Sequence, residues 1–467
     1  MKKTAAFLAI MVLFTGKVFS EFDFGFYGKG VFTPIAFSGN DSSVSAATAT
    51  YANNSRPDVG FTMLGNNDSK TIGMVGDVNF NLSGTAGIGS NANIWVAPFD
   101  WIKLTLGKFE ADEFRGQVGT SDFGSWMLPE GSKDEDAIFN RFKSDVGAHI
   151  IVKPLFWLDS EWADLIIAGA VGSSLGGERA FNNIMGWSAE DVYLAGQGAI
   201  GYRIPGIGFV RFQFIGNNRE VYLEDYPSTG QNGKYRMMSG LSTNSDSDII
   251  QTAFLYDGIE NLKIDAGLKV PLAYTTSLPD YVYYHSNYTT PPYQTGSLAG
   301  NDNLEIQQPY LLSLGASYAW NNLNALLRTD LSFGGKYVHE GVRTITIGQG
   351  MGIAASVSYG FLQRFRAGLD LGFNYHQIDS IEVNGKTELI GERKNDQETS
   401  EHNDFGFMPW FSMNLGGGSI KTGVAVMMPS SPRYSYDPNH PARSDGWRQT
   451  HSGEPLISIP ISLTYYF

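Results

Sequence analysis

Alternation of apolar and polar side chains is the dominant pattern in this sequence. The clearest cases are Leu262 to Val270, Leu323 to Phe333 and Arg364 to His376, each about ten residues long with apolar residues in one phase and charged residues in the other. A β-strand sends successive side chains to opposite faces, so each segment predicts a strand with one apolar and one polar face. Helical spacing fits none of the three segments.

The same pattern repeats along the chain and predicts 18 strands. Two of the assignments are weak, Pro57 to Leu64 and the boundary near Ser83 to Gly89, and a count of 16 follows if that hairpin is a loop. The predicted strands begin near Phe22, Pro57, Thr71, Asn91, Trp101, Asp145, Asp164, Val192, Ile207, Asp248, Leu262, Pro309, Leu323, Thr346, Arg364, Asp404, Ser419 and Glu454.

Connections between the predicted strands are of two kinds. From residue 101 onward, short turn-forming sequences such as Pro205-Gly206 and Asn321-Asn322 alternate with long polar segments such as Asn217 to Ser247. The pattern is that of an all-β, antiparallel, up-and-down transmembrane barrel with short periplasmic turns and long extracellular loops. Aromatic residues gather near the short turns, which predicts an aromatic girdle at that membrane interface.

The last strand, Leu456 to Phe467, has an unbroken apolar phase from Ile457 to Phe467 and a mostly hydroxylic phase between. The chain stops on an aromatic residue in the apolar phase. In this it resembles the closing strand of bacterial outer-membrane β-barrels, in which the terminal Phe belongs to the assembly signal. That resemblance implies recognition of the Phe467 strand by the barrel-assembly machinery. An edge strand of a soluble sandwich is the alternative.

A sheet that spans a bilayer must close on itself, because lipid cannot satisfy free backbone groups. A charge facing lipid near the midplane would cost about 2 to 4 kcal/mol, so the polar phase is expected to face the lumen. The candidate pore-lining residues are Lys263, Asp265, Lys269, Arg328, Asp330, Arg364, Arg366, Asp370, Arg203 and Arg211. Pairing within the wall, as between Arg328 and Asp330, is the alternative to free lumen charges.

Composition and the N-terminal segment indicate an exported protein. Residues 1–20 begin with Lys2 and Lys3, continue through an apolar run and end in a small-x-small site, which predicts a cleaved signal peptide and leaves 21–467 as one barrel domain. The chain has no cysteine, so thiolate metal sites and disulfides are absent. A net charge of −14 argues against a nucleic-acid partner. The expected location is the outer membrane of a diderm bacterium, with outer-membrane lipid around the wall.

Residues 110–144 form a long acidic connection that also holds apolar anchors such as Phe114 and Trp126. This segment resembles the inward-folded constriction loop of general porins, and the stretch from Gly107 to Gly116 loosely resembles porin-type barrels of spirochaetes. The resemblance implies a loop that narrows the lumen. Its candidate residues are Asp112, Glu113, Arg115, Asp122, Asp134 and Asp136. A surface loop that caps the extracellular mouth is the alternative.

Motifs for chemistry are weak. Gly172 to Gly176 fits G-x-S-x-G, but it ends a predicted strand and lacks the strand-to-helix elbow that the motif needs. The histidines show no metal-ligand spacing, and His149 and His376 are expected to line the lumen. A tyrosine-rich loop, Tyr274 to Tyr293, could stack on sugars or simply pack rigidly. No catalytic residue, metal or cofactor is expected.

The sequence therefore predicts an outer-membrane porin, a passive diffusion channel for small hydrophilic solutes or ions. Two alternatives remain open: a transporter for hydrophobic molecules that resembles the fatty-acid channels, and a barrel that carries a surface adhesin or hydrolase in its loops. A homotrimer is also left open, because porins often trimerise through their walls and nothing in the sequence tests it.

Overall fold

The computed structural model describes most of the predicted barrel and the parts of its connections nearest to the wall. The described residues are 21–38, 41–45, 58–81, 86–111, 116–125, 127–128, 142–158, 164–173, 196–216, 248–277, 281–285, 294–298, 303–339, 343–377, 380–383, 386–389, 401–429, 433–436, 447–451 and 455–466. The predicted signal peptide, residues 1–20, lies outside them and stays a prediction.

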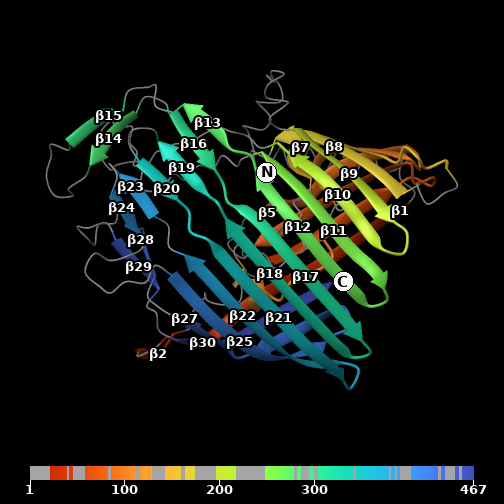
Figure 1. The fold of residues 1–467 in the computed structure, drawn as a ribbon. Helices are drawn as coiled ribbons and strands as arrows, with labels where there is room; N and C mark the ends of the chain where they lie inside the picture. Colours follow the sequence, from red (N-terminus) through yellow and green to blue (C-terminus); the bar gives the residue numbers. More distant parts are fainter. Residues whose placement is uncertain are drawn as a thin grey trace.

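An 18-strand antiparallel wall closes into a barrel (Figure 1). β1 pairs with β3 on one side and with β30 on the other, so the first and last strands seal the sheet. β26 and β27 together fill one position, because both pair with β25 and with β30. The prediction of 18 strands is therefore confirmed over the alternative of 16.

The first nine positions are β1 (Glu21–Ser38), β3 (Asp58–Asn66), β4 (Ile72–Asn81), β5 (Ala86–Phe99), β6 (Ile102–Glu110), β7 (Lys143–Val152), β8 (Leu165–Ser173), β9 (Gly196–Ile204) and β10 (Gly208–Ile215). The rest are β11 (Ile249–Ile259), β12 (Leu262–Pro271), β17 (Tyr310–Trp320), β18 (Leu323–Phe333), β21 (Gly350–Phe361), β22 (Phe365–Gln377), β25 (Glu401–Asn414), β26 (Gly418–Gly423) with β27 (Ala425–Pro429), and β30 (Leu456–Tyr466).

Strand starts agree best where the alternation is strict. β12 and β18 begin at Leu262 and Leu323, as the polarity pattern predicts. β5 begins at Ala86, ahead of the predicted Asn91. The early residues of β5 are all small except Ile88, so they pair with β4 without showing a clear alternation of apolar and polar side chains.

Cross-strand register puts the charged phase of neighbouring strands on one face. Asp265 pairs with Gly315, which pairs with Arg328, and this row continues through Ala354 to Gly372. The side chains of Asp265 and Arg328 on this face are 3% and 1% exposed.

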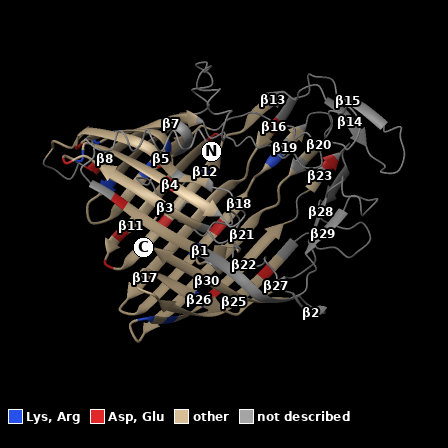
Figure 2. Cartoon of the chain, turned by 180° about the vertical axis from the view of Figure 1, so that it is seen from behind, with Lys and Arg blue, Asp and Glu red and all other residues tan. Residues whose placement is uncertain are grey.

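The other face of the wall is apolar and exposed. Leu314, Leu327 and Phe212 lie in this phase and are 48%, 50% and 50% exposed. Buried charges with exposed apolar side chains are the reverse of a soluble sandwich and fit a wall whose outside contacts lipid. Figure 2 shows that most of the wall is uncharged, with Lys, Arg, Asp and Glu scattered along it.

Short strands lie beyond the wall on the side of the long connections, most of them in small separate sheets (Figure 1). The prediction that the long segments are loops is therefore wrong in part, since they contain strands that pair with one another. Their apolar runs are too short to register as separate strands in the sequence. These strands are β2 (Asp41–Ser45), β13 (Tyr274–Ser277), β14 (Tyr281–His285), β15 (Gln294–Leu298), β16 (Asn303–Gln307), β19 (Lys336–His339), β20 (Arg343–Thr346), β23 (Ser380–Val383), β24 (Lys386–Leu389), β28 (Arg433–Tyr436) and β29 (Trp447–His451).

The short turns are tight and aromatic. Asn261 and Asn321 adopt φ of 64° and 51°, a left-handed conformation that Asn tolerates in hairpin turns. Near another turn, Trp101 stacks on Phe99 with ring centroids 5.5 Å apart, and Trp157 meets it edge-on at 5.5 Å. Exposed rings at this end are the arrangement expected of an interfacial girdle.

Candidate functional site

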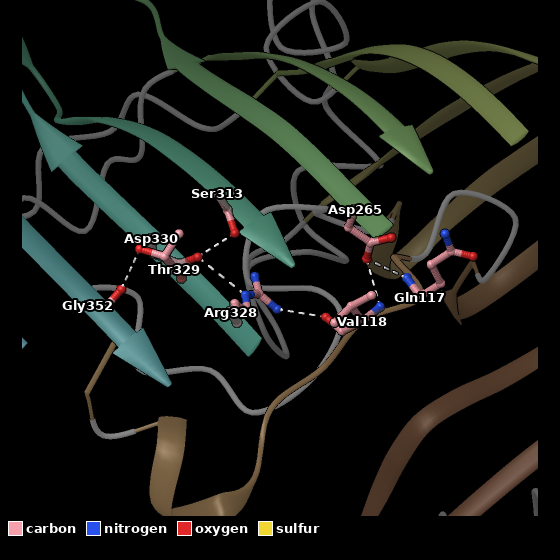
Figure 3. Close-up of polar contacts among 8 residues, drawn as sticks. All are labelled: Gln117, Val118, Asp265, Ser313, Arg328, Thr329, Asp330 and Gly352. Atoms are coloured by element: carbon pink, nitrogen blue, oxygen red, sulfur yellow. Dashed lines mark hydrogen bonds and ion pairs between the residues drawn. The ribbon is translucent and has the colours of Figure 1, made fainter. Parts of the chain in front are cut away.

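The inner face of β12, β17 and β18 holds the candidate site drawn in Figure 3. Asp265, Arg328 and Asp330 project from this face and are 3%, 1% and 0% exposed. Three of the predicted pore-lining residues therefore lie together, and protein covers all of them. Strict alternation puts them on the inner face, and the register of β17 between β12 and β18 brings them together.

A segment from the connection between β6 and β7 contacts these charges. The backbone N–H groups of Gln117 and Val118 donate to Asp265 Oδ2 at 2.8 and 2.7 Å, and Arg328 Nη1 donates to the carbonyl oxygen of Val118 at 3.1 Å (Figure 3). One carboxylate and one guanidinium thus hold consecutive backbone groups of the same segment. Charge-assisted hydrogen bonds of this kind contribute about 1.5 to 3 kcal/mol each.

Asp330 completes the cluster from the wall side. Arg328 Nε pairs with Asp330 Oδ1 at 3.3 Å, and Ser313 Oγ hydrogen bonds to the same oxygen. The pairing of Arg328 with Asp330, weighed in the sequence as the alternative to free lumen charges, is thus present. Removing one member of such a buried pair leaves the other charge uncompensated.

Glycines on the inner wall accommodate the next part of the segment. A Cβ added at Gly352 would lie 2.0 Å from the carbonyl oxygen of Met127, and one at Gly372 would lie 2.1 Å from Met127 Cγ. At Gly406 it would lie 2.6 Å from Phe123 Cζ. These glycines therefore have no room for a side chain. Because they carry none, Phe123 and Met127 pack directly against the backbone of β21, β22 and β25.

Apolar packing and a hydrogen bond fix this end of the segment. Phe123 lies in the single-turn helix α2 (Asp122–Ser125), and Met127 follows two residues after its end. They are 1% and 0% exposed and cluster with Met408 and Met427 of the wall. Asn374 Nδ2 of β22 donates to the carbonyl oxygen of Met127 at 3.1 Å. Residues 116–128, where described, therefore lie against the inner face of the wall from β12 to β27.

A second polar cluster lies around Asp370, which is 0% exposed. Asp370 Oδ1 accepts from Ser356 Oγ at 2.7 Å and from Trp410 Nε1 at 2.8 Å, and Lys421 Nζ pairs with Oδ2 at 3.3 Å. Lys421 also sits 4.3 Å from the centre of the Trp410 ring. The positive charge of Lys421 is thus neutralised by a carboxylate and shielded by an aromatic face.

The inner face from β7 to β11 carries an apolar cluster beside buried polar side chains such as Arg211 and Gln213, and the alternation pattern did not predict this cluster. Ile151, Phe209, Ile249 and Leu255 face inward by register, and they are at most 8% exposed. They belong to one buried cluster with Phe109, Ala111, Phe142, Ala168, Ala170, Ala199, Ile215, Ala253 and Leu311. Many of these residues are small, so the polarity of their strands alternates too weakly to reveal a buried inner face.

The remaining predicted wall residues take different positions. Arg203 lies near a short turn and pairs with Asp257 at 2.8 Å, with side chains 47% and 37% exposed. Arg211 is 1% exposed on the inner face of β10. Lys263 is exposed and Lys269 is half-buried.

The remaining predicted sites are only partly described. Asp122 begins α2, whereas Asp112, Glu113, Arg115, Asp134 and Asp136 lie outside the described residues. His149 is 3% exposed and packs between Phe109 and Phe142, with ring centroids 5.4 and 5.9 Å away. Of the G-x-S-x-G string, Gly172 and Ser173 end β8, and the rest is outside the described residues.

Within the part of the chain that the structure describes, no group of His, Asp and Glu side chains is placed to hold a metal ion. None of the helices in that part is long and apolar enough to cross a bilayer.

No family model and no curated protein matches the sequence. Among solved structures, the chain is similar to OmpT, an outer-membrane protein of Vibrio cholerae in a trimer form, with a TM-score of 0.43 and 10% identity over 96% of this chain and 100% of that one. An anion-selective porin from Comamonas acidovorans gives a TM-score of 0.43 and 10% identity over 96% and 100% of the two chains. The outer-membrane channel DcaP of Acinetobacter baumannii gives 0.40 and 10% over 96% and 97%.

The closed wall of the chain identifies its fold. A closed antiparallel sheet leaves no backbone edge to satisfy in lipid, and its exposed apolar face meets lipid while its charges face inward. The chain is an 18-stranded antiparallel β-barrel whose apolar outer face is that of a membrane-spanning wall.

Proposed function

We propose that this barrel is a porin, a passive diffusion channel for small hydrophilic solutes or ions. The observation that carries the proposal is the placement of Asp265, Arg328, Asp330 and Asp370 on the inner face of a wall whose outer face is apolar. An 18-stranded wall encloses a lumen wide enough for water unless something fills it. Rings of charged side chains in such a lumen set ion selectivity.

Narrowing of the lumen is assigned to segment 110–144. Its described part, from Gln117 to Leu128, packs on the inner wall over β12 to β27 and so takes up space inside the barrel. Hydrogen bonds that its backbone donates to Asp265 and accepts from Arg328 hold it there. In this proposal solutes pass beside the segment and size exclusion follows from its position.

Single-channel recording of the refolded full-length protein in planar bilayers tests the proposal. Stable openings that scale with salt concentration, with a reversal potential in a salt gradient, are the expected result. Folding is checked independently by resistance of the barrel to protease and by its β-sheet circular dichroism. Protein that passes both checks and inserts into the bilayer but never conducts would contradict the porin assignment.

A transporter for hydrophobic molecules is the second candidate, because Ile151, Phe209, Leu255 and their neighbours form an apolar cluster on the inner side of β7 to β11. The buried polar side chains of Arg211 and Gln213 on the same face favour the porin instead. Assays in liposomes distinguish the two functions. A porin admits sugars and swells the vesicles, whereas a hydrophobic transporter leaves swelling unchanged and binds a fluorescent fatty acid.

The homotrimer left open by the sequence stays a proposal for this chain. Analytical ultracentrifugation in density-matched detergent measures the protein mass of the complex, and a mass of one chain would exclude the trimer.

A further inference from the structure

A cavity of about 480 Å³ opens at the short-turn end of the barrel, away from the contacts of segment 116–128. It lies among three neighbouring turn regions, those of β17–β18, β21–β22 and β25–β26. Its polar lining includes Asn322, Gln363, Arg364, Arg366, Ser412 and Asn414. A volume of this size is typical of sites for small molecules.

The lining of this cavity contains the guanidinium groups of Arg364 and Arg366 and no carboxylate. Arg366 Nη1 donates to Ser358 Oγ at 3.2 Å, and Asn324, with its amide oriented to suit both partners, accepts from the same guanidinium. Both of these partners are neutral. Arg364 is exposed, and no carboxylate among the described residues pairs with it or with Arg366.

Three cations of the barrel, Arg328, Lys421 and Arg203, do have carboxylate partners. Arg328 pairs with Asp330 at 3.3 Å, and Lys421 pairs with Asp370 at 3.3 Å. At the short-turn end, Arg203 pairs with Asp257 at 2.8 Å. The cavity therefore concentrates uncompensated positive charge in a chain whose net charge is −14.

Backbone contacts hold the two arginines in place. Leu362 and Gln363 form a tight turn with φ of 50° and 55° just before Arg364. The N–H of Asn414 donates to the carbonyl oxygen of Arg364 at 2.6 Å, which ties this turn to the end of β25. Arg366 is fixed in the ladder between Gly360 and Ser412. A site formed in advance loses less conformational entropy when it binds.

The geometry points to a binding site for a small oxyanion, a phosphate or a carboxylate, at this mouth of the barrel. The planar guanidinium groups of Arg364 and Arg366 provide bidentate donors that match the oxygens of such groups. The amides of Asn322, Gln363 and Asn414 add neutral donors around them. The effect of this site on permeation rests on the proposed channel function, but binding itself does not.

Equilibrium dialysis of the folded full-length barrel in nonionic detergent tests the site, with radiolabelled inorganic phosphate and radiolabelled succinate as separate probes at low ionic strength. We expect saturable binding of one anion per chain, and the probe that binds more tightly distinguishes phosphate from carboxylate. Arg364→Gln should weaken binding about tenfold, the loss expected for one charge-assisted hydrogen bond. Arg364→Gln with Arg366→Gln should abolish it.

Arg203→Gln is the matched control, because it removes an arginine of the same barrel end that already has a carboxylate partner. Binding should remain unchanged in this variant. Arg364 is exposed, so Arg364→Gln is expected to fold even if the double variant does not. No saturable binding of either probe, or equal affinity in Arg364→Gln, would overturn the site. A barrel that binds phosphate but never conducts would keep the site and remove the channel function.

Discussion

Replacing Asp265 by Ala should release segment 116–128 from the inner wall. Asp265 accepts hydrogen bonds from two backbone N–H groups, at 2.8 and 2.7 Å, and is 3% exposed. At about 1.5 to 3 kcal/mol for each hydrogen bond to a charged group, the gross loss is about 3 to 6 kcal/mol. Asp265 Oδ1 has no hydrogen-bond partner among the described residues, and relief of that buried oxygen offsets about 1 to 3 kcal/mol.

The net loss is about 0 to 5 kcal/mol, and its midpoint of about 2.5 kcal/mol corresponds to a roughly 70-fold rise in the released fraction. Because the chain has no cysteine, a single introduced thiol reports this release cleanly. In Val118→Cys the backbone bonds persist and the side chain is placed where Val118 is 1% exposed. The rate of its modification by a small, charged thiol reagent should rise by the same factor when Asp265→Ala is added.

Asp257→Ala serves as the control, because it removes a nearby carboxylate that pairs with the exposed Arg203 instead of with the segment. Added to Val118→Cys, it should leave the modification rate of the introduced thiol unchanged. If the thiol is modified no faster with Asp265→Ala than with this control, the two hydrogen bonds do not hold the segment and the assignment of its anchor is refuted.

Three further predictions concern the wall. Leu327→Arg puts a charge on the outer face, where Leu327 is 50% exposed, and should lower the free energy of unfolding in lipid vesicles by about 2 to 4 kcal/mol, measured by urea titration. Gly372→Ala places a Cβ 2.1 Å from Met127 Cγ and should destabilise the barrel by about 1 to 3 kcal/mol in the same titration. Asp370→Asn leaves Lys421 without its carboxylate partner and should shift the reversal potential toward anion selectivity.

Each of these has a matched comparison. Gly25→Ala is the control for Gly372→Ala, because a Cβ at Gly25 meets nothing within 4 Å. Equal destabilisation by the two alanines would mean that Gly372 is not needed to make room for Met127. For the lipid face, a stable Leu327→Arg barrel would contradict the outward placement of that phase. An unchanged reversal potential in Asp370→Asn would show that ions do not pass near Lys421.

The sequence by itself determined the architecture. Lipid outside and polar groups inside impose one period on every wall strand, so alternation predicted all 18 positions and even the start of β12 at Leu262. The same period put Asp265, Arg328 and Asp370 in the inner phase. Where most side chains are small, as from Ala86 to Ser90 with Ile88 the one exception, the signal failed and the predicted strand start was displaced.

The tertiary structure decided what the inner face contacts. Alternation assigns a side chain to a face but says nothing of what covers it, and Gln117 lies 148 residues from the carboxylate that holds it. Gly372 and Gly406 look like ordinary strand glycines until Met127 and Phe123 pack on them. Such contacts depend on closure of the whole barrel, which brings distant strands and a long connection into one space, and no local pattern records that.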